Sequence, residues 1–159
     1  MDYVTVKWLH ILSSTLLFGT GIGSAFYLLV VTLSQDVRAV ATVSRWVVVA
    51  DWTFTATSAV FQPLSGLWLL HLMGGLPLAT PWVAASLWLY ALAIACWLPV
   101  VWIQVRLRDL SARAADAGEA LPPRFWFFFR WWVGLGFVAF FAFVAIFYLM
   151  VAKRLPFAV

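Results

Sequence analysis

The chain has 159 residues, of which 65% are hydrophobic and 10% are charged, and its mean hydropathy is +1.00. A soluble domain carries roughly 45 to 50% apolar and about 25% charged residues, so an ordinary soluble domain is excluded. The formal net charge is +4. The basic residues follow the pattern of a membrane topology, so the expected partner is the lipid bilayer, and no nucleic acid is expected.

Four apolar runs each exceed the roughly 20 residues that a helix needs to cross a bilayer. They cover residues 4–33, 46–72, 82–105 and 131–152. Backbone groups in hydrocarbon must be hydrogen-bonded within the segment, so these runs are predicted to be helices. We expect an all-α fold, an integral membrane four-helix bundle that forms a single domain over residues 1–159.

The connectors between the runs indicate how the helices are arranged. Residues 34–45 are short, residues 73–81 contain turn formers, and residues 106–130 begin as a helical extension that Gly118, Pro122 and Pro123 end. Seven basic residues flank the first and third connectors, against three on the other side. The positive-inside rule therefore places both termini on the outer side of the membrane and the two basic connectors in the cytoplasm.

The first run contains an ionisable side chain, His10. Such a residue inside a membrane span usually faces the protein interior and marks a site. At about 100° per residue, His10 shares a helix face with small and polar residues. These are Ser14, Leu17, Gly21 and Ser24. Gly19 and Gly23 form a small-xxx-small pair that favours close helix packing and is compatible with a homo-oligomer.

The second run carries a polar stripe, which is a set of residues on one helix face. Its members are Asp51, Thr55, Ser58, Gln62, Ser65 and Gly66. Polar atoms in hydrocarbon need partners, so the stripe must face other helices or a wet cavity. Either its hydroxyls bond their own backbone while Gln62 bonds across to the first run, or the stripe lines a ligand path.

Two further residues of this run have specific expectations. Asp51 is expected to form a salt bridge with Arg45, Arg106 or Arg130, with a proton-carrying or cation-binding role as the alternative. Pro63 is predicted to kink the helix and to free a backbone carbonyl near Ser58 and Ala59.

The third and fourth runs add further inward faces. The third aligns Ser86, Tyr90, Ala93, Trp97 and Gln104, and the fourth aligns Arg130, Gly134, Phe137, Phe141 and Tyr148. Because the runs alternate in direction, the outer half of the bundle should gather His10 with hydroxyls, an amide and aromatic rings. The predicted pocket residues are His10, Ser14, Gln62, Ser65, Gly66, Tyr90 and Tyr148.

One imidazole in such surroundings suits a b-type haem with His10 as the ligand of the haem iron, or a planar substrate. It also suits a core histidine bonded to a hydroxyl. Copper or zinc would need more ligands, and His71 points about 160° away from the Asp51 direction at 100° per residue. A hydrolytic triad is not expected, because Asp51 lies at the wrong depth to orient His10.

Several segments resemble a bacterial family of four-span integral membrane proteins of unknown function. They are KWLHIL at residues 7–12, QPLSGL at 62–67, WLPVV at 97–101 and FYLMVAK at 147–153. The lysine and histidine pattern of the first run and the GLWL segment at residues 66–69 are similar, more distantly, to the HemJ-type protoporphyrinogen oxidases and to CopD-like membrane domains. In the HemJ-type family the histidine corresponding to His10 is implicated in haem binding, so the resemblance implies a haem site.

The chain departs from the HemJ-type pattern at other positions. Ser86 stands where that family has a lysine, Val133 and Gly134 stand where it has an Asn-Glu pair, and a histidine at the end of the first run is missing. The resemblance therefore implies haem b or porphyrin binding in a bacterial inner membrane, with both termini periplasmic, rather than an oxidoreductase of the HemJ type. The redox roles left open are electron exchange with a quinone and porphyrin oxidation. The alternative is a non-enzymatic membrane subunit or a small-solute permease that uses Asp51, Thr55, Ser58 and Gln62.

Overall fold

The structure is a computed structural model that describes residues 1–156, and within this range all of the regular structure is helical. The elements are α1 (Tyr3–Leu33), α2 (Val37–Ala50), the π-helical turn η1 (Asp51–Thr55), α3 (Ala56–Leu72), α4 (Pro81–Ala117) and α5 (Pro123–Ala152). No loop separates α2, η1 and α3, so the chain stays helical from Val37 to Leu72.

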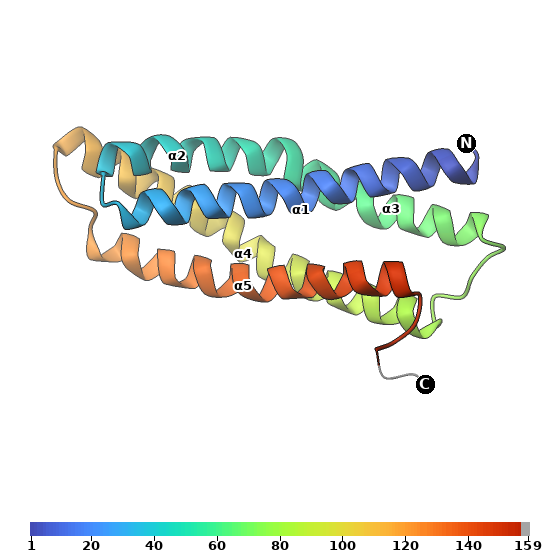
Figure 1. Cartoon of the computed structure of the whole chain (residues 1–159). Helices are drawn as coiled ribbons and strands as arrows, with labels where there is room; N and C mark the ends of the chain where they lie inside the picture. The colour runs from blue at the N-terminus through green and yellow to red at the C-terminus, as the bar shows by residue number, and fades with distance from the viewer. Residues whose placement is uncertain (157–159) are drawn as a thin grey trace.

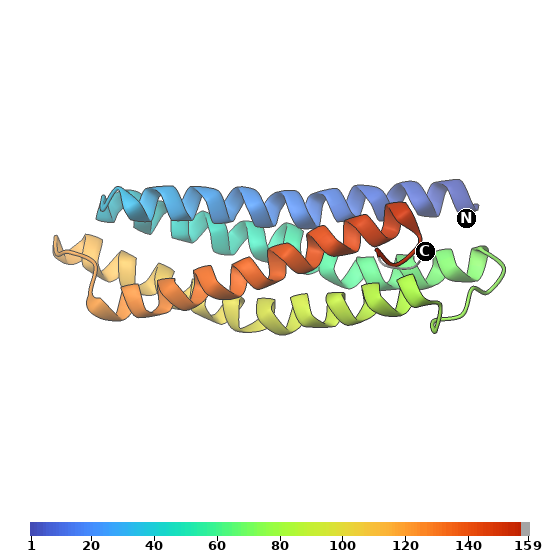
Figure 2. The ribbon, with the colours of Figure 1, turned by 60° about the horizontal axis from the view of Figure 1, so that its bottom comes forward.

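The helices lie side by side along one long axis (Figures 1 and 2). The start of α1 and the end of α5 lie at the same end of the molecule as the connector between α3 and α4, and the other two connectors lie at the opposite end (Figure 1). We call the latter the connector end. Helix α4 packs most extensively on α5, whereas α1 and α5 make few contacts with each other.

The helix ends follow from local chemistry. Pro81 and Pro123 stand in the first turns of α4 and α5, where the missing N–H costs no helical hydrogen bond. Gly118 ends α4 with a left-handed φ of 66°, a conformation that glycine adopts without a steric penalty. Asp36 caps α2 by accepting a hydrogen bond from the Ala39 N–H at 3.0 Å.

The helices are longer than the apolar runs that predicted them. Helix α2 begins at Val37, so most of the first connector is helical, and α4 continues to Ala117. The predicted helical extension of the third run, ended by Gly118, is confirmed. Hydropathy locates the hydrocarbon-crossing part of a helix, and the polar turns at its ends lie beyond that signal.

The tightest core lies at the connector end and joins all the long helices. Its largest fully buried side chains include Leu28, Val40, Leu107 and Phe125, which are at most 1% exposed. Stacked rings of Phe125, Phe129 and Trp132 continue it along α5, with centroids 6.1 and 5.7 Å apart. Burial of these side chains holds the connector end together.

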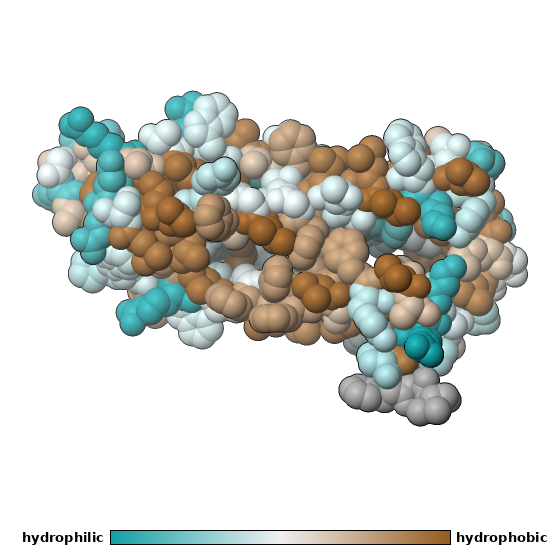
Figure 3. All heavy atoms as spheres, viewed as in Figure 1, coloured by the Kyte–Doolittle hydropathy of each residue, from teal (hydrophilic) through white to brown (hydrophobic). Residues whose placement is uncertain are grey.

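Three helices are long and apolar enough to cross a membrane by length and composition. They are α1, α4 and α5, which have 31, 37 and 30 residues. Many large hydrophobic side chains on the outside are exposed, among them Trp88 at 78% and Val151 at 86%. Hydrophobic residues occupy the middle of the visible face, and hydrophilic ones gather toward its two ends (Figure 3). This surface fits a lipid surround.

Candidate functional site: an intramembrane cavity at Asp51

The π-helical turn η1 places two polar residues in the protein interior. The Ala56 N–H donates to the Asp51 carbonyl, a bond that spans five residues instead of four. Such turns are rare and occur frequently at functional sites. Asp51 is 5% exposed and Thr55 is 6% exposed, so both side chains face inward.

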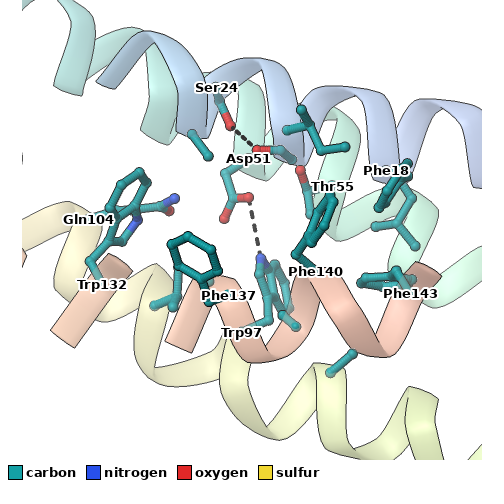
Figure 4. Close-up of a pocket in the computed structure, with 18 of the residues that line it drawn as sticks. Phe18, Ser24, Asp51, Thr55, Trp97, Gln104, Trp132, Phe137, Phe140 and Phe143 are labelled. Atoms are coloured by element: carbon teal, nitrogen blue, oxygen red, sulfur yellow. Dashed lines mark hydrogen bonds between the residues drawn. The ribbon is translucent and has the colours of Figure 1, made fainter. Parts of the chain in front are cut away.

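A cavity of about 370 Å³ opens beside this turn, between α1, α4 and α5. Its lining is mostly aliphatic and aromatic, and rings from α4 and α5 surround the Asp51 carboxylate (Figure 4). The aromatic lining residues are Phe18, Phe26, Trp97, Trp132, Phe137, Phe140 and Phe143. The cavity lies where α1 and α5 make little contact, so helix separation creates the space.

The Asp51 carboxylate has one paired and one unpaired oxygen. The Trp97 indole N–H donates to Oδ1 at 3.3 Å (Figure 4), and Oδ2 has no hydrogen-bond partner. The Thr55 hydroxyl is also buried without a partner. Unpaired polar groups in a low-dielectric interior are costly, so these atoms represent unused binding capacity.

The cavity lining contains an acidic side chain but no basic one. Its other polar lining residues are Ser24, whose hydroxyl donates to the Gly21 carbonyl at 3.2 Å, and Gln104, which is 5% exposed. No lysine, arginine or histidine is among the lining residues. Asp51 is therefore the only ionisable side chain that lines the cavity in the described part of the chain.

The expected salt bridge of Asp51 is absent from residues 1–156, where the ion pair that forms joins Arg108 to Asp109 at 2.8 Å. Arg45 and Arg106 instead lie over the rings of Trp46 and Trp102, at 5.8 and 5.1 Å from the ring centroids. An arginine that stacks on an interfacial tryptophan keeps its charge in water, whereas Asp51 lies deeper.

His10 lies outside this cavity lining, at the contact between α1 and α3. Its Nδ1 is 2.7 Å from the Ser65 hydroxyl oxygen, which in turn lies 2.8 Å from the Phe61 carbonyl. The single hydrogen of the hydroxyl goes either to that carbonyl or to His10 Nδ1, depending on the tautomer of the imidazole. In the tautomer that carries its hydrogen on Nδ1, the Nε2 lone pair is available to a ligand.

Two other predicted pocket residues join His10. Gln62 Nε2 donates to the His10 carbonyl at 3.1 Å, which is the bond expected under the first of the two alternatives for the polar stripe. Gly66 packs against the ring, because a Cβ at this position would lie 3.4 Å from His10 Cε1. His10, Gln62, Ser65 and Gly66 thus form one group, which we call the His10 cluster.

The Tyr90 side chain contacts α3 one helical turn from the His10 cluster. Pro63 has no N–H to offer the Ala59 carbonyl four residues earlier, and the Tyr90 hydroxyl donates to that carbonyl. The predicted release of a carbonyl near Ala59 is therefore confirmed, and Tyr90 supplies the missing donor.

The remaining predicted residues have other surroundings. The Ser14 hydroxyl donates to the Ile11 carbonyl of its own helix at 2.7 Å, Ser58 is 6% exposed on α3, and Tyr148 is 48% exposed on α5. His71 lies exposed in the last turn of α3. In the described residues no group of three or more His, Cys, Asp or Glu side chains could hold a metal ion.

Trp97 and Gln104 were predicted to lie on an inward face, but no contact with Asp51 was predicted. Phe18, Phe140 and Phe143 were not predicted as residues of a site. The available signal was a carboxylate at the same depth as an inward-facing tryptophan on a neighbouring span. The π-helical turn has no comparable sequence signature.

The fold and the site together define a helical integral membrane protein with a buried carboxylate at an internal cavity. The chain belongs to the family described as "Predicted integral membrane protein (DUF2269)", whose profile matches residues 4–154. Neither a curated protein nor a solved structure shows a match to the chain.

Proposed function

We propose that this protein binds a small lipophilic cation in the Asp51 cavity and carries it across the membrane. The observation that supports this proposal is the unpaired carboxylate oxygen of Asp51, a residue that is 5% exposed and lines the cavity. An ammonium group would supply the missing partner of Oδ2, and the aromatic rings would favour a cation over an anion. The apolar lining would hold the organic part of the ligand.

The proposal includes a topology. The continuous helix Val37–Leu72 is the fourth span, besides α1, α4 and α5, because its two halves together have the length that α3 alone lacks. The seven basic residues flanking the connector end then lie in the cytoplasm, and both termini lie outside. Asp2→Cys and Glu119→Cys, each made in a Cys96→Ala background so that the chain has a single cysteine, test this orientation. An impermeant maleimide applied to intact cells should label the first and spare the second.

Ligand binding is tested with benzyltrimethylammonium and its neutral carbon isostere, neopentylbenzene. The full chain is purified in mild detergent, and the dissociation constant of each probe is measured by equilibrium dialysis. We expect the cation to bind, and Asp51→Asn to weaken its binding at least about tenfold. The probe has no N–H, so the loss reports the attraction between the two charges, which is about 4 kcal/mol at about 4 Å and an effective dielectric constant of about 20.

The matched control is Asp116→Asn, which removes an exposed carboxylate from the connector end of α4 and should leave binding unchanged. Equal binding of the two probes, or equal binding to wild type and Asp51→Asn, would refute the proposal. Uptake of the same cation into vesicles containing the protein then separates carriage from binding alone.

A second candidate is haem b or porphyrin binding at His10, with a redox role toward a quinone. It is favoured by one observation, the 2.7 Å contact between His10 Nδ1 and the Ser65 hydroxyl, which in the Nδ1–H tautomer would orient Nε2 as in metal-bound histidines. A bound haem would supply one-electron chemistry. The test is an absorption spectrum of protein purified with added haemin. Absence of a Soret band, or the same band in His10→Ala, would eliminate this candidate.

A further inference from the structure

Two arginines at the connector end are held over aromatic rings that touch each other. Arg106 Cζ lies 5.1 Å from the centroid of the Trp102 ring on α4, and Arg124 Cζ lies 5.7 Å from that of Phe128 on α5. The two rings contact edge to face, with centroids 5.4 Å apart and an angle of 83° between their planes. These four residues form one unit across two helices, which we call the arginine–aromatic cluster.

The positive charge of this cluster is not neutralised within the described chain. Neither arginine takes part in the ion pair found in residues 1–156, which joins Arg108 to Asp109. Both arginines are exposed, whereas Phe128 is 7% exposed and is fixed in the core. A guanidinium stacked on a ring keeps its N–H donors free at its edge, in a geometry that matches phosphate oxygens.

The arginine–aromatic cluster lies beside an exposed apolar surface that a lipid could cover. Trp102 is 51% exposed and Leu98, one turn toward the middle of α4, is 59% exposed, so an apolar surface continues from the arginines along the helix. Tryptophan prefers the level of the lipid headgroups. On the proposed topology this end faces the cytoplasm, where anionic lipids attract basic residues.

We propose that the arginine–aromatic cluster binds the phosphate of an anionic phospholipid, with Arg106 and Arg124 as donors and the acyl chain along Trp102 and Leu98. This site is separate from the Asp51 cavity and does not depend on a cationic ligand there. A phospholipid is favoured over free phosphate because the charged end of the cluster continues into an exposed apolar surface, which free phosphate would not use.

The test uses the full chain in mild detergent and measures the thermal unfolding midpoint during titration with phosphatidylglycerol. We expect saturable stabilisation of the wild type. The variant R106Q/R124Q should bind more weakly, by about fivefold for each arginine removed. K153Q/R154Q removes the same charge from the other end of the molecule and should respond as the wild type does.

Three further arms distinguish the sources of binding. Phosphatidylcholine should stabilise the protein much less, and inorganic phosphate at the same concentration should have no effect. W102L keeps the charge but removes the ring beneath Arg106, so it should also weaken phosphatidylglycerol binding. Equal responses of R106Q/R124Q and K153Q/R154Q, an unchanged response in W102L, or equal stabilisation by phosphatidylcholine or inorganic phosphate would overturn the proposal.

Discussion

The His10 cluster and the Asp51 cavity both contain polar side chains of the helix Val37–Leu72, yet they use them in opposite ways. At His10, Gln62 and Ser65 form bonds that join α3 to α1. At Asp51, a carboxylate oxygen and the Thr55 hydroxyl remain unpaired beside an open volume. Paired polar groups therefore stabilise the contact between two helices, whereas unpaired ones lower the stability and leave atoms that a ligand can bind.

The largest expected effect is at the His10 cluster, where the contact is tight. Gly66→Leu adds a branched side chain at a position whose Cβ would already lie 3.4 Å from His10 Cε1. Forcing extra carbons into a packed contact should lower the free energy of unfolding by about 3 kcal/mol. The measurement is reversible thermal unfolding in mild detergent.

The matched control for this change is Gly134→Leu, at an exposed helical position with nothing within 4 Å of its added Cβ. We expect its stability to stay within about 0.5 kcal/mol of the wild type or to rise slightly, because glycine is a poor helix former. Equal losses in the two variants would mean that the contact between His10 and Gly66 is not tight.

Tyr90→Phe tests whether the hydroxyl satisfies the carbonyl that Pro63 releases. Loss of the donor leaves the Ala59 carbonyl without its partner, so the free energy of unfolding should fall by about 2 kcal/mol. Pro63→Ala restores an N–H to that carbonyl, so the same tyrosine change should cost less than about 0.5 kcal/mol in the Pro63→Ala background. A double-mutant cycle measured by thermal unfolding gives both values, and an equal cost in the two backgrounds would contradict this role.

Asp51→Asn should have the opposite sign from the changes at the His10 cluster. The amide is uncharged and can still accept a hydrogen bond from Trp97, so removing an unpaired buried carboxylate should raise the free energy of unfolding by about 1 kcal/mol at neutral pH. Thermal unfolding is compared with that of Asp116→Asn, which is exposed and should not change. A loss of stability in Asp51→Asn would show that its carboxylate has a structural partner.

Side-chain chemistry made part of this arrangement predictable. Gln62 could be assigned a partner on the first run because an amide in hydrocarbon must be paired, and Pro63 could be assigned a free carbonyl because it lacks an N–H. The choice of donor for that carbonyl was not predictable, since Tyr90 was equally compatible with lining a pocket. That choice depends on the spacing between α3 and α4, which no local pattern encodes.

The cavity was less predictable for a related reason. A rotation of about 100° per residue applies to an unbroken α-helix. The π-helical turn η1 departs from that geometry at Asp51 and Thr55. The salt bridge expected for Asp51 fails because Arg45 and Arg106 stack on tryptophans instead. The low contact between α1 and α5, which creates the volume, is a property of the whole packing arrangement.

The smallest expected effect is that of a substitution at Gly136 in the cavity lining. This substitution should change stability and ligand binding in opposite directions. Gly136 lines the cavity, and a Cβ added there meets nothing within 4 Å, so Gly136→Ala should raise the free energy of unfolding by about 0.5 kcal/mol. The new methyl group takes up ligand space, so benzyltrimethylammonium should bind more weakly while the protein becomes more stable.

Gly134→Ala, on the same helix but outside the lining, should show the stability gain with unchanged binding. If both variants bind the cation equally, the ligand does not occupy the volume beside Gly136, and the proposed site must lie elsewhere along the Asp51 face.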